Sequence, residues 1–328
     1  MHLRRIIASA LPLGLAAGQV QTKCNPLQSD CPPDPAFGAD HVFDFTSGPL
    51  SDVWETTAGH VSLDKTGAAF TIAKEGDSPT IRTKFYIFFG RIEIWLRVAP
   101  GQGIISSAML LSDDLDEIDW EFMGSNKSFA TTNYFSKGIL DYHNGGAHPM
   151  TGMQDEYHNY TLDWSKDELS WYINQNKVRS LKAVDANQTR SYPQTPARLS
   201  LGIWAGGSPD NAPGVRQWAG GDTDYSQSYT MYVQKVQISD YNSGREYSYG
   251  DHSGSWQSIK IEGGDSEAKQ QLNREPEMSM SDRFNGLSRG AKTGIITPSS
   301  APPPSATRWS SSKARGPTRT PAAPSAAA

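Results

Sequence analysis

Regular alternation of apolar and polar residues between positions 90 and 98 most constrains what this chain can fold into. Ile92, Ile94 and Leu96 fall on one side of the pattern, and Arg91 and Glu93 begin the other. A repeat of two residues is that of a β-strand, in which successive side chains point to opposite faces of a sheet. The segment therefore predicts a strand with one face buried in a core.

Short strand-like segments recur across the middle of the chain, separated by turn residues such as Gly, Pro, Asn and Asp. We expect further strands at 69–73, 80–88, 104–111, 131–135, 158–164, 169–173, 177–181, 198–204 and 229–239. The only helix that the sequence favours is a short surface helix over 265–274. Regular short strands without a helix of more than two turns indicate an all-β protein, specifically a β-sandwich.

One strand carries an unusual set of acids. Residues 116–124 read Asp-Glu-Ile-Asp-Trp-Glu-Phe-Met-Gly, so a strand here places Glu117, Asp119 and Glu121 on one face and three large apolar side chains on the other. An amphipathic edge strand with an acidic wet face is the simpler alternative, but like charges along a strand repel and Asp and Glu are poor strand formers. Such a cluster suits chemistry in which one carboxyl is protonated and another is ionised.

The spacing of these acids limits the reaction. Two carboxyls about 5–5.5 Å apart suit double displacement through a covalent glycosyl-enzyme, whereas a separation of about 6.5–9.5 Å leaves room for an attacking water. The Cα atoms of Glu117 and Glu121 lie about 13 Å apart on a straight strand. Their side chains can approach each other only over the hollow side of a curved sheet.

The two ends of the chain differ in composition from its middle. Residues 1–18 resemble a secretory signal peptide, because Arg4 and Arg5 precede an apolar run that ends in small residues. We expect a folded domain over 19–262 and a disordered, low-complexity tail rich in Pro, Ser and Ala over 263–328. The protein is therefore expected to be secreted.

Cysteine usage and glycosylation motifs agree with export. The chain has two cysteines, Cys24 and Cys31, which are expected to form a small disulfide loop near the mature N-terminus. Three Asn-x-Ser/Thr triplets begin at Asn126, Asn159 and Asn187 and mark potential N-glycosylation sites.

The charge distribution excludes some partners. The chain carries a formal net charge of −5, but seven basic residues and one acid follow position 279, so residues 1–279 carry −11. An acidic body repels nucleic acids and anionic membranes, whereas a neutral polysaccharide is compatible with it. The three histidines at 143, 148 and 158 lack short ligand spacing, so neither a metal nor another cofactor is expected.

Several further motifs accompany the acidic strand. They are Cys24-Asn25-Pro26-Leu27, Cys31-Pro32-Pro33-Asp34-Pro35, Thr132-Asn133-Tyr134-Phe135, His158-Asn159-Tyr160-Thr161-Leu162-Asp163-Trp164, Leu201-Gly202-Ile203-Trp204-Ala205-Gly206-Gly207, Trp218-Ala219-Gly220-Gly221 and Ser253-Gly254-Ser255-Trp256-Gln257-Ser258-Ile259. With these motifs the chain resembles glycoside hydrolase family 16 and, more narrowly, the fungal Crh-type cell-wall transglycosylases. The resemblance covers about residues 22–262. It implies a jelly-roll, concanavalin-like sandwich of two curved antiparallel sheets.

The resemblance also implies roles for the acids. Glu117 would be the nucleophile that attacks the anomeric carbon, and Glu121 would be the acid and then the base. Asp119 would hold Glu117 ionised and Glu121 protonated. By family analogy the donor is chitin and the acceptor is β-glucan or chitin, so the enzyme would cross-link the fungal cell wall. The same residues could serve mainly as a hydrolytic endo-glucanase or chitinase, and a non-catalytic wall-binding lectin is a third alternative.

Sugar-binding residues are predicted from the aromatic side chains and from departures from the family pattern. Tyr134, Trp204 and Trp218 are the candidate sugar platforms, because pyranose faces stack on aromatic rings. Ser200 stands where the family usually has a longer polar residue, and Val215 stands where it commonly has Thr. Both positions are therefore expected to influence donor binding, as is Glu121.

The C-terminus departs from the resemblance as well. Crh-type proteins often end in a hydrophobic signal for a glycosylphosphatidylinositol anchor, but residues 321–328 read Pro-Ala-Ala-Pro-Ser-Ala-Ala-Ala, with no apolar run of the required length of about 10–20 residues. A membrane anchor is therefore not predicted. We expect a monomer that is secreted and acts in the cell wall.

Overall fold

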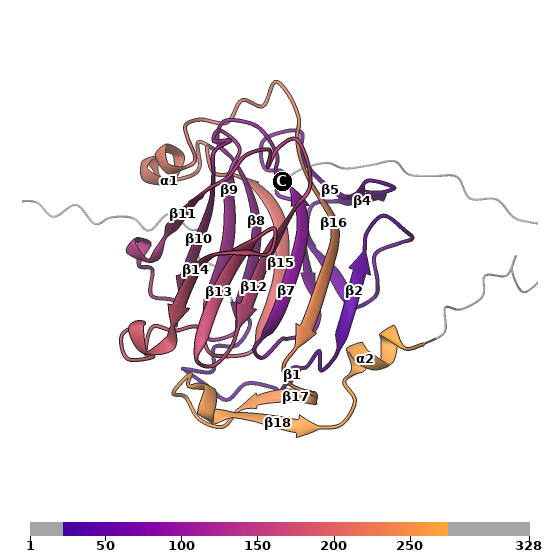
Figure 1. Ribbon diagram of the computed structural model, residues 1–328, viewed down its shortest axis with the longest axis vertical. Coiled ribbons are helices and arrows are strands. Elements are labelled where there is room, and N and C mark those ends of the chain that lie inside the picture. The colour runs from indigo at the N-terminus through magenta and orange to yellow at the C-terminus, as the bar shows by residue number, and fades with distance from the viewer. Residues whose placement is uncertain (1–21, 275–328) are drawn as a thin grey trace, which may run out of the picture. The chain divides into compact units, whose positions relative to one another are not determined.

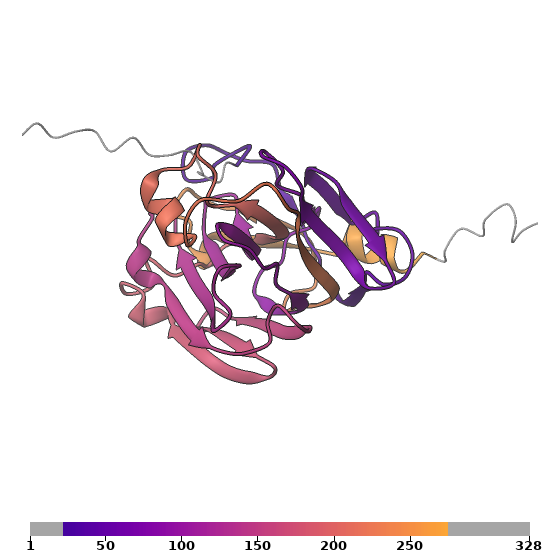
Figure 2. The same ribbon diagram turned by 90° about the horizontal axis from the view of Figure 1, so that it is seen from above.

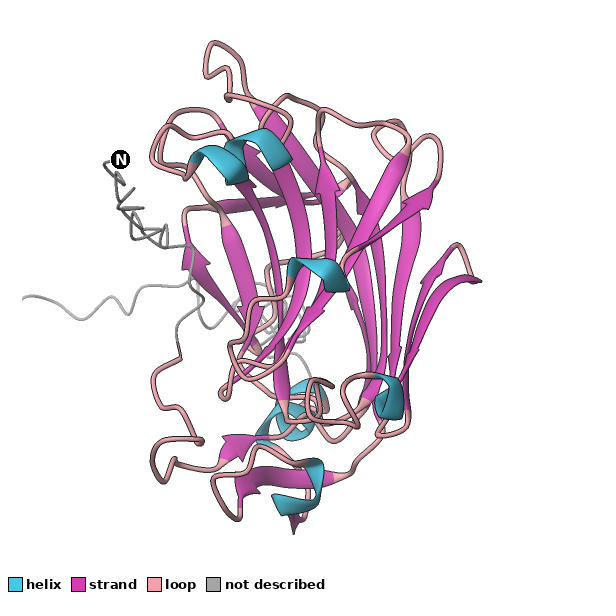
Figure 3. Cartoon of the chain, turned by 90° about the vertical axis from the view of Figure 1, so that its left-hand side faces the viewer, coloured by secondary structure: helices cyan, strands magenta, loops and turns pink. Residues whose placement is uncertain are grey.

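The structure is a computed structural model that describes residues 22–274, and strands dominate this part of the chain (Figure 3). The predicted signal peptide, residues 1–18, and the tail from residue 275 onward lie outside the described residues. Two large antiparallel sheets pack face to face, which confirms the expected all-β sandwich (Figure 2). Among residues 22–274 no helix is both long enough and apolar enough to cross a bilayer.

The first large sheet contains the acidic strand near its middle. Its seven strands have the order β11-β10-β9-β8-β15-β6-β3, and all neighbours are antiparallel. In that order their bounds are Gly146–Pro149, Phe129–Phe135, Glu117–Met123, Ile104–Ser112, Ala197–Ala205, Thr80–Thr83 and Trp54–Ala58.

The second large sheet covers the other side of the core. Its main path is β14-β13-β12-β7-β16-β5-β4, and β2 pairs with the second half of β16. The bounds in that path are Asn176–Lys182, Glu168–Ile173, His158–Trp164, Gly90–Arg97, Tyr229–Asp240, Gly67–Ile72 and Val61–Asp64, with β2 at Asp40–Asp44. The long strands β15, β7 and β16 bow along their length (Figure 1).

Smaller elements close the ends of the sandwich. A third sheet joins β1 (Asp34–Pro35), β17 (Gly244–Tyr249) and β18 (Ile259–Gly263) in the order β1-β17-β18. The helices are α1 (Pro213–Trp218) and α2 (Glu267–Leu272), and three short 3₁₀ turns lie at Tyr142–Asn144, Ala183–Asp185 and Trp256–Ser258. Ala268 of α2 is buried against the core, so the folded body extends beyond residue 262, where the sequence placed its end.

The core lies between the two large sheets and follows the predicted alternation. Ile92, Ile94 and Leu96 of β7 are fully buried, and Trp164 and Trp171 fill the same layer from β12 and β13. Each such side chain contributes about 1.5–3 kcal/mol when it leaves water. The strand pattern read from the sequence therefore identifies the face that packs inward.

Two details of the fold answer particular expectations. Cys24 and Cys31 form the predicted disulfide, with their Cα atoms 5.8 Å apart. So short a loop contributes only about 2–2.5 kcal/mol in the chain-entropy model. The strand expected over 80–88 is shorter, because β6 ends at Thr83, where the Thr83 hydroxyl donates to the carbonyl of Phe85.

The three glycosylation motifs differ in accessibility. Asn187 is exposed and Asn126 is half-buried, both in loops. Asn159 lies in β12 with only 5% of its surface exposed, and its amide nitrogen donates to Glu93 while its amide oxygen accepts from the Thr161 hydroxyl. A glycan cannot be accommodated at a buried strand residue whose amide is already bonded. The structure thus corrects the expectation for Asn159.

Candidate active site

The three acids of β9 lie on one face of the seven-stranded sheet. In the register with β10, Glu117 pairs with Phe135, Asp119 with Asn133, and Glu121 with Thr131. The acids are thus two residues apart along one strand and project to the same side. We call this side of the sheet the acid face. Glu117 and Glu121 are half-buried, whereas Asp119 between them is only 2% exposed.

The opposite face of β9 fixes the strand to the core. Trp120 and Phe122 are completely buried, and both contact the Tyr160 ring of the second sheet at centroid distances of 5.5 and 4.5 Å. The Trp171 indole of β13 donates a hydrogen bond across the sandwich to the backbone carbonyl of Asp119, at 3.2 Å. The backbone of the acidic strand is therefore anchored from both its neighbours and the facing sheet.

The surroundings separate the protonation states of the three carboxyls. Burial, then the charge of Glu117, raises the pKa of Glu121 to about 7. Burial, then the charges of Glu117 and Glu121, then a hydrogen bond to Glu117 raise the pKa of Asp119 well above its ordinary value. Burial also raises the pKa of Glu117, but the hydrogen bond from Asp119 opposes that shift. Asp119 thus keeps its proton and donates a hydrogen bond to the Glu117 carboxylate.

This arrangement provides an ionised carboxylate and a protonated carboxylic acid on one face. The proton on Asp119 reduces the repulsion that three charged groups would otherwise suffer and stabilises the negative charge on Glu117. Glu121 holds its proton near neutral pH and can release it there. A nucleophile next to an acid whose pKa matches neutral pH is the pair that retaining glycosidic-bond chemistry requires.

Strand register places two of the predicted sugar-binding residues on the acid face. Ser200 of β15 pairs with Met109 of β8, which in turn pairs with Asp119. Trp204 lies four residues further along β15, level with Met123 at the end of β9, just beyond Glu121. Both side chains are half-buried.

The two predicted tryptophan platforms form a pair. Trp204 stacks on Trp218 of α1, with ring centroids 6.0 Å apart and an interplanar angle of 23°. Trp218 is 39% exposed, which is unusual for so large an apolar side chain. Val215 belongs to the same short helix and is half-buried. The end of β15 and helix α1 therefore form an accessible aromatic surface next to Glu121.

Tyr134 does not lie with the acids. It pairs with Ile118, so its side chain projects from the core face of β10, where the Arg179 guanidinium packs over its ring at 5.5 Å. This position on the core face argues against the predicted role of Tyr134 as a sugar platform. Its neighbour Asn133 lies on the acid face, opposite Asp119.

Several acid-face residues were missed by sequence reasoning. Asn133 and Ser107 flank the acids on β10 and β8, and Arg82 of β6 lies directly across from Ser200. Arg82 bonds Glu55 of β3 at 2.7 Å, so this side of the acid face is polar and charged. The alternation within each strand could have suggested these residues, but only the pairing between strands identifies them.

Comparison with known proteins agrees with this geometry. Residues 51–227 match the family described as glycosyl hydrolases family 16. Crh-like protein 5 of Aspergillus fumigatus is 48% identical over 260 residues, which cover 78% of this chain and 65% of that protein. Congo red hypersensitive protein 1 of Saccharomyces cerevisiae is 44% identical over 247 residues, which cover 74% of this chain and 48% of that protein. The chain spans less than two thirds of the length of these relatives.

Solved structures give the same result. A structure described as apo Crh5 transglycosylase is 50% identical, has a TM-score of 0.72, and is matched over 73% of this chain and all of that one. The same statistics apply to Crh5 transglycosylase in complex with NAG. A Bacillus licheniformis β-glucanase, 20% identical with a TM-score of 0.52 over 61% of this chain and 97% of its own, shares the fold. The predicted jelly-roll sandwich is confirmed.

Proposed function

The chain belongs to glycosyl hydrolase family 16, and from this premise we propose that it is a retaining transglycosylase that cleaves chitin and joins the fragment to β-glucan or to chitin. The observation that carries the proposal is the acid face, where protonated Asp119 donates a hydrogen bond to Glu117 and the pKa of Glu121 is raised to about 7. A lectin has no need for carboxyls held in different protonation states.

In the first step Glu117 is the nucleophile. One of its carboxylate oxygens forms a bond to the anomeric carbon of the donor while the bond from that carbon to the glycosidic oxygen breaks. Glu121 transfers its proton to the departing oxygen, which leaves as a sugar hydroxyl. Asp119 keeps its proton and its hydrogen bond to Glu117, which favours the ionised form of the nucleophile beforehand.

In the second step Glu121 is the base. It takes the proton of an incoming hydroxyl group, whose oxygen bonds to the anomeric carbon as the ester bond to Glu117 breaks. Two displacements on opposite sides of the carbon retain the original configuration. An acceptor sugar gives a new glycosidic link, whereas water gives hydrolysis. The two outcomes use the same carboxyls and differ in how the acceptor is held.

The substrate assignment rests on the relatives and on the aromatic pair. A solved relative is named a transglycosylase and has been seen with NAG, the sugar unit of chitin. Trp204 and Trp218 offer stacked faces beside Glu121, and Ser200 lies two strands from Asp119 on the same face. These residues, with Val215 in α1, would contact the sugar chain. The protein would act as a secreted monomer in the fungal cell wall.

The experiment that tests the proposal follows the fate of two sugars at once. The secreted protein is incubated with chitin oligosaccharides and a fluorescent β-glucan oligosaccharide, and the products are separated and weighed by mass spectrometry. Labelled products that have gained N-acetylhexosamine units support transfer. Shortened chitin together with unchanged labelled β-glucan supports hydrolysis instead. Recovery of both sugars intact would contradict the proposal that the protein is an enzyme.

Activity should depend on pH in a direction that the carboxyls determine. Glu121 must be protonated in the first step, and its pKa lies at about 7. Above that pH kcat/KM should therefore fall about tenfold per pH unit. On the acid side activity should be lost as Glu117 becomes protonated, at a pH above the ordinary glutamate range, because burial raises the pKa of Glu117. Initial rates with a chitin oligosaccharide between pH 3 and 9 test this, and a profile that stays flat to pH 9 would contradict it.

A further inference from the structure

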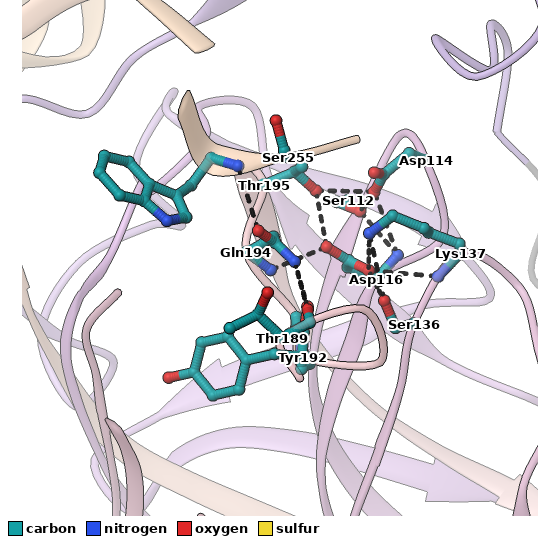
Figure 4. Close-up of polar contacts among 12 residues, drawn as sticks. Ser112, Asp114, Asp116, Ser136, Lys137, Thr189, Tyr192, Gln194, Thr195 and Ser255 are labelled. Atoms are coloured by element: carbon teal, nitrogen blue, oxygen red, sulfur yellow. Dashed lines mark hydrogen bonds and ion pairs between the residues drawn. The ribbon is translucent and has the colours of Figure 1, made fainter. Parts of the chain in front are cut away.

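A buried polar cluster lies at the start of the acidic strand (Figure 4). Its centre is Asp116, the residue before Glu117, with 2% of its surface exposed. None of the steps above uses this carboxylate. One oxygen, Oδ1, accepts hydrogen bonds from the Ser136 hydroxyl at 2.6 Å and the Lys137 backbone at 3.2 Å. The other, Oδ2, accepts from the Gln194 backbone at 2.8 Å and the Thr195 hydroxyl at 3.1 Å.

These four bonds join three segments that are distant in sequence. Ser136 and Lys137 follow β10, Gln194 and Thr195 precede β15, and Asp116 itself precedes β9. The ammonium of Lys137 also lies 3.7 Å from Oδ1. The Asp116 carboxylate therefore holds the first residue of the acidic strand against the loops on either side of it.

The turn before Asp116 depends on the same cluster. Leu115 has a φ of +66°, a left-handed conformation that a branched side chain adopts at a cost of about 1–2 kcal/mol. The Ser112 hydroxyl accepts from the Asp116 backbone at 2.8 Å and donates to Asp114 at 2.5 Å. The Thr195 hydroxyl lies 2.6 Å from Asp114 as well as 3.1 Å from Asp116, so its single proton is shared between the two carboxylates. Side-chain hydrogen bonds thus stabilise the strained backbone conformation of the turn that precedes Glu117.

The loop that faces Asp116 is itself fixed by a side chain. The Gln194 amide donates to the carbonyls of Thr189 and Tyr192, at 2.8 and 3.1 Å, and accepts from the Trp256 backbone at 3.2 Å. Trp256 lies next to β18 of the small third sheet. Two of the donors to Asp116, on Gln194 and Thr195, therefore lie in a loop that is itself held in place by hydrogen bonds of the Gln194 side chain.

We propose that Asp116 is a positioning residue, whose four buried hydrogen bonds set where the Glu117 carboxylate stands relative to Glu121. The inference rests on the proposed function, because it matters only where the separation of the two carboxyls decides the rate. Double displacement needs the pair about 5–5.5 Å apart. A displacement of about 1 Å in a reacting group can cost about 100-fold in rate. The residue next to the nucleophile, held on both oxygens, limits such movement.

Asp240 provides a matched comparison for a purely structural role. It is a half-buried carboxylate, and it accepts hydrogen bonds from the Gly38 and Asn242 backbones at 3.0 and 3.1 Å and from the Tyr247 hydroxyl at 2.7 Å. It ends β16 in the other large sheet and has no bond to the acidic strand. Replacing Asp240 removes the same kind of interaction without reaching Glu117.

The test compares Asp116→Asn and Asp240→Asn with the wild type on a dinitrophenyl chitin oligosaccharide, a donor whose leaving group needs no proton. The first step then reports on Glu117 and not on Glu121. Asp116→Asn should lower kcat about 10- to 100-fold per folded molecule, with KM within about threefold. Whichever carboxylate oxygen the NH₂ group replaces, it would face two hydrogen-bond donors in place of an acceptor. Asp240→Asn should stay within about twofold of the wild-type kcat despite a comparable loss of melting temperature.

Two further measurements keep the outcomes distinct. Should Asp116→Asn fail to fold, Ser136→Ala removes the 2.6 Å bond to Asp116, together with a 3.4 Å bond from the Lys137 ammonium, and should lower kcat by about 3- to 10-fold. Crystal structures of the variants show the position of Glu117 independently of activity, and we expect its carboxylate to shift in Asp116→Asn and Ser136→Ala but not in Asp240→Asn. The proposal is overturned if Glu117 does not move in Asp116→Asn, or if Asp116→Asn and Asp240→Asn lose the same fraction of the wild-type kcat. A wild type with no turnover would instead refute the proposed function.

Discussion

Glu117→Gln is expected to reduce turnover of a chitin oligosaccharide by on the order of 10⁴-fold. An amide oxygen cannot form the ester bond to the anomeric carbon, and no other carboxyl on β9 can replace it, because Asp119 is protonated and buried and Glu121 has the opposite task. Gln has the size of Glu, and its amide oxygen can still accept the hydrogen bond from Asp119. The loss should therefore appear in kcat, with the melting temperature and binding of the chitin oligosaccharide nearly unchanged.

Glu93→Gln is the matched control for this substitution. Glu93 lies on β7 in the other large sheet, and its carboxylate accepts hydrogen bonds from Arg91 and Asn159. Its replacement should leave turnover within about twofold, since it lies outside the acid face. Initial rates by chromatography, with calorimetry for folding, decide the matter. A Glu117→Gln protein that keeps more than a tenth of the wild-type rate would mean that another group attacks the sugar.

The shared face of the acids was predictable because it follows from geometry within one strand. Once residues 117–123 form a strand, Glu117, Asp119 and Glu121 must project to one side whatever the strand pairs with. The same holds for Ser200 and Trp204 on β15. Local alternation thus determines which residues of a strand lie together, and it also located the core positions of β7.

Relations between strands could not be read in the same way. Whether Asn133 or Tyr134 faces the acids depends on how β10 pairs with β9, and both residues have plausible side chains for a sugar site. The sequence of β10 alone does not set that register. Burial of Asn159 escaped prediction for a similar reason, because its partner Glu93 lies 66 residues away in the chain. The bonds of Asp116 to Gln194 and Thr195 span 78 and 79 residues.

Continuous apolar runs were the other source of error. Residues 85–89 read Phe-Tyr-Ile-Phe-Phe, which suits a buried strand by composition, and all five are buried. After β6 ends at Thr83, Ile87 forms only an isolated bridge with Ala197, and Phe89 has a φ of +59°. Burial without alternation is satisfied equally well by an irregular segment. Alternation is informative because only one backbone shape produces it.

Glu121→Gln should separate the two proton-transfer steps from nucleophilic attack. With natural chitin the leaving oxygen needs a proton, so the variant should lose about 10³- to 10⁴-fold in kcat/KM. With a dinitrophenyl donor the leaving group departs unaided, and formation of the glycosyl-enzyme on Glu117 should proceed within about tenfold of the wild-type rate. The second step then lacks its base. The ester should accumulate, visible as a burst of dinitrophenol equal to the enzyme and as added mass on the peptide that contains Glu117.

Azide provides the decisive control for that assignment, because it is a nucleophile that needs no base. It should release the trapped sugar from Glu121→Gln as a glycosyl azide of retained configuration and restore steady turnover of the activated donor. The wild type already has its base and should gain little, and Glu117→Gln should form no ester that azide could attack. Equal losses on natural and activated donors in Glu121→Gln, without a burst or azide rescue, would assign the proton transfer to another residue. The raised pKa of Glu121 would then reflect its burial beside Glu117 and not a role in catalysis.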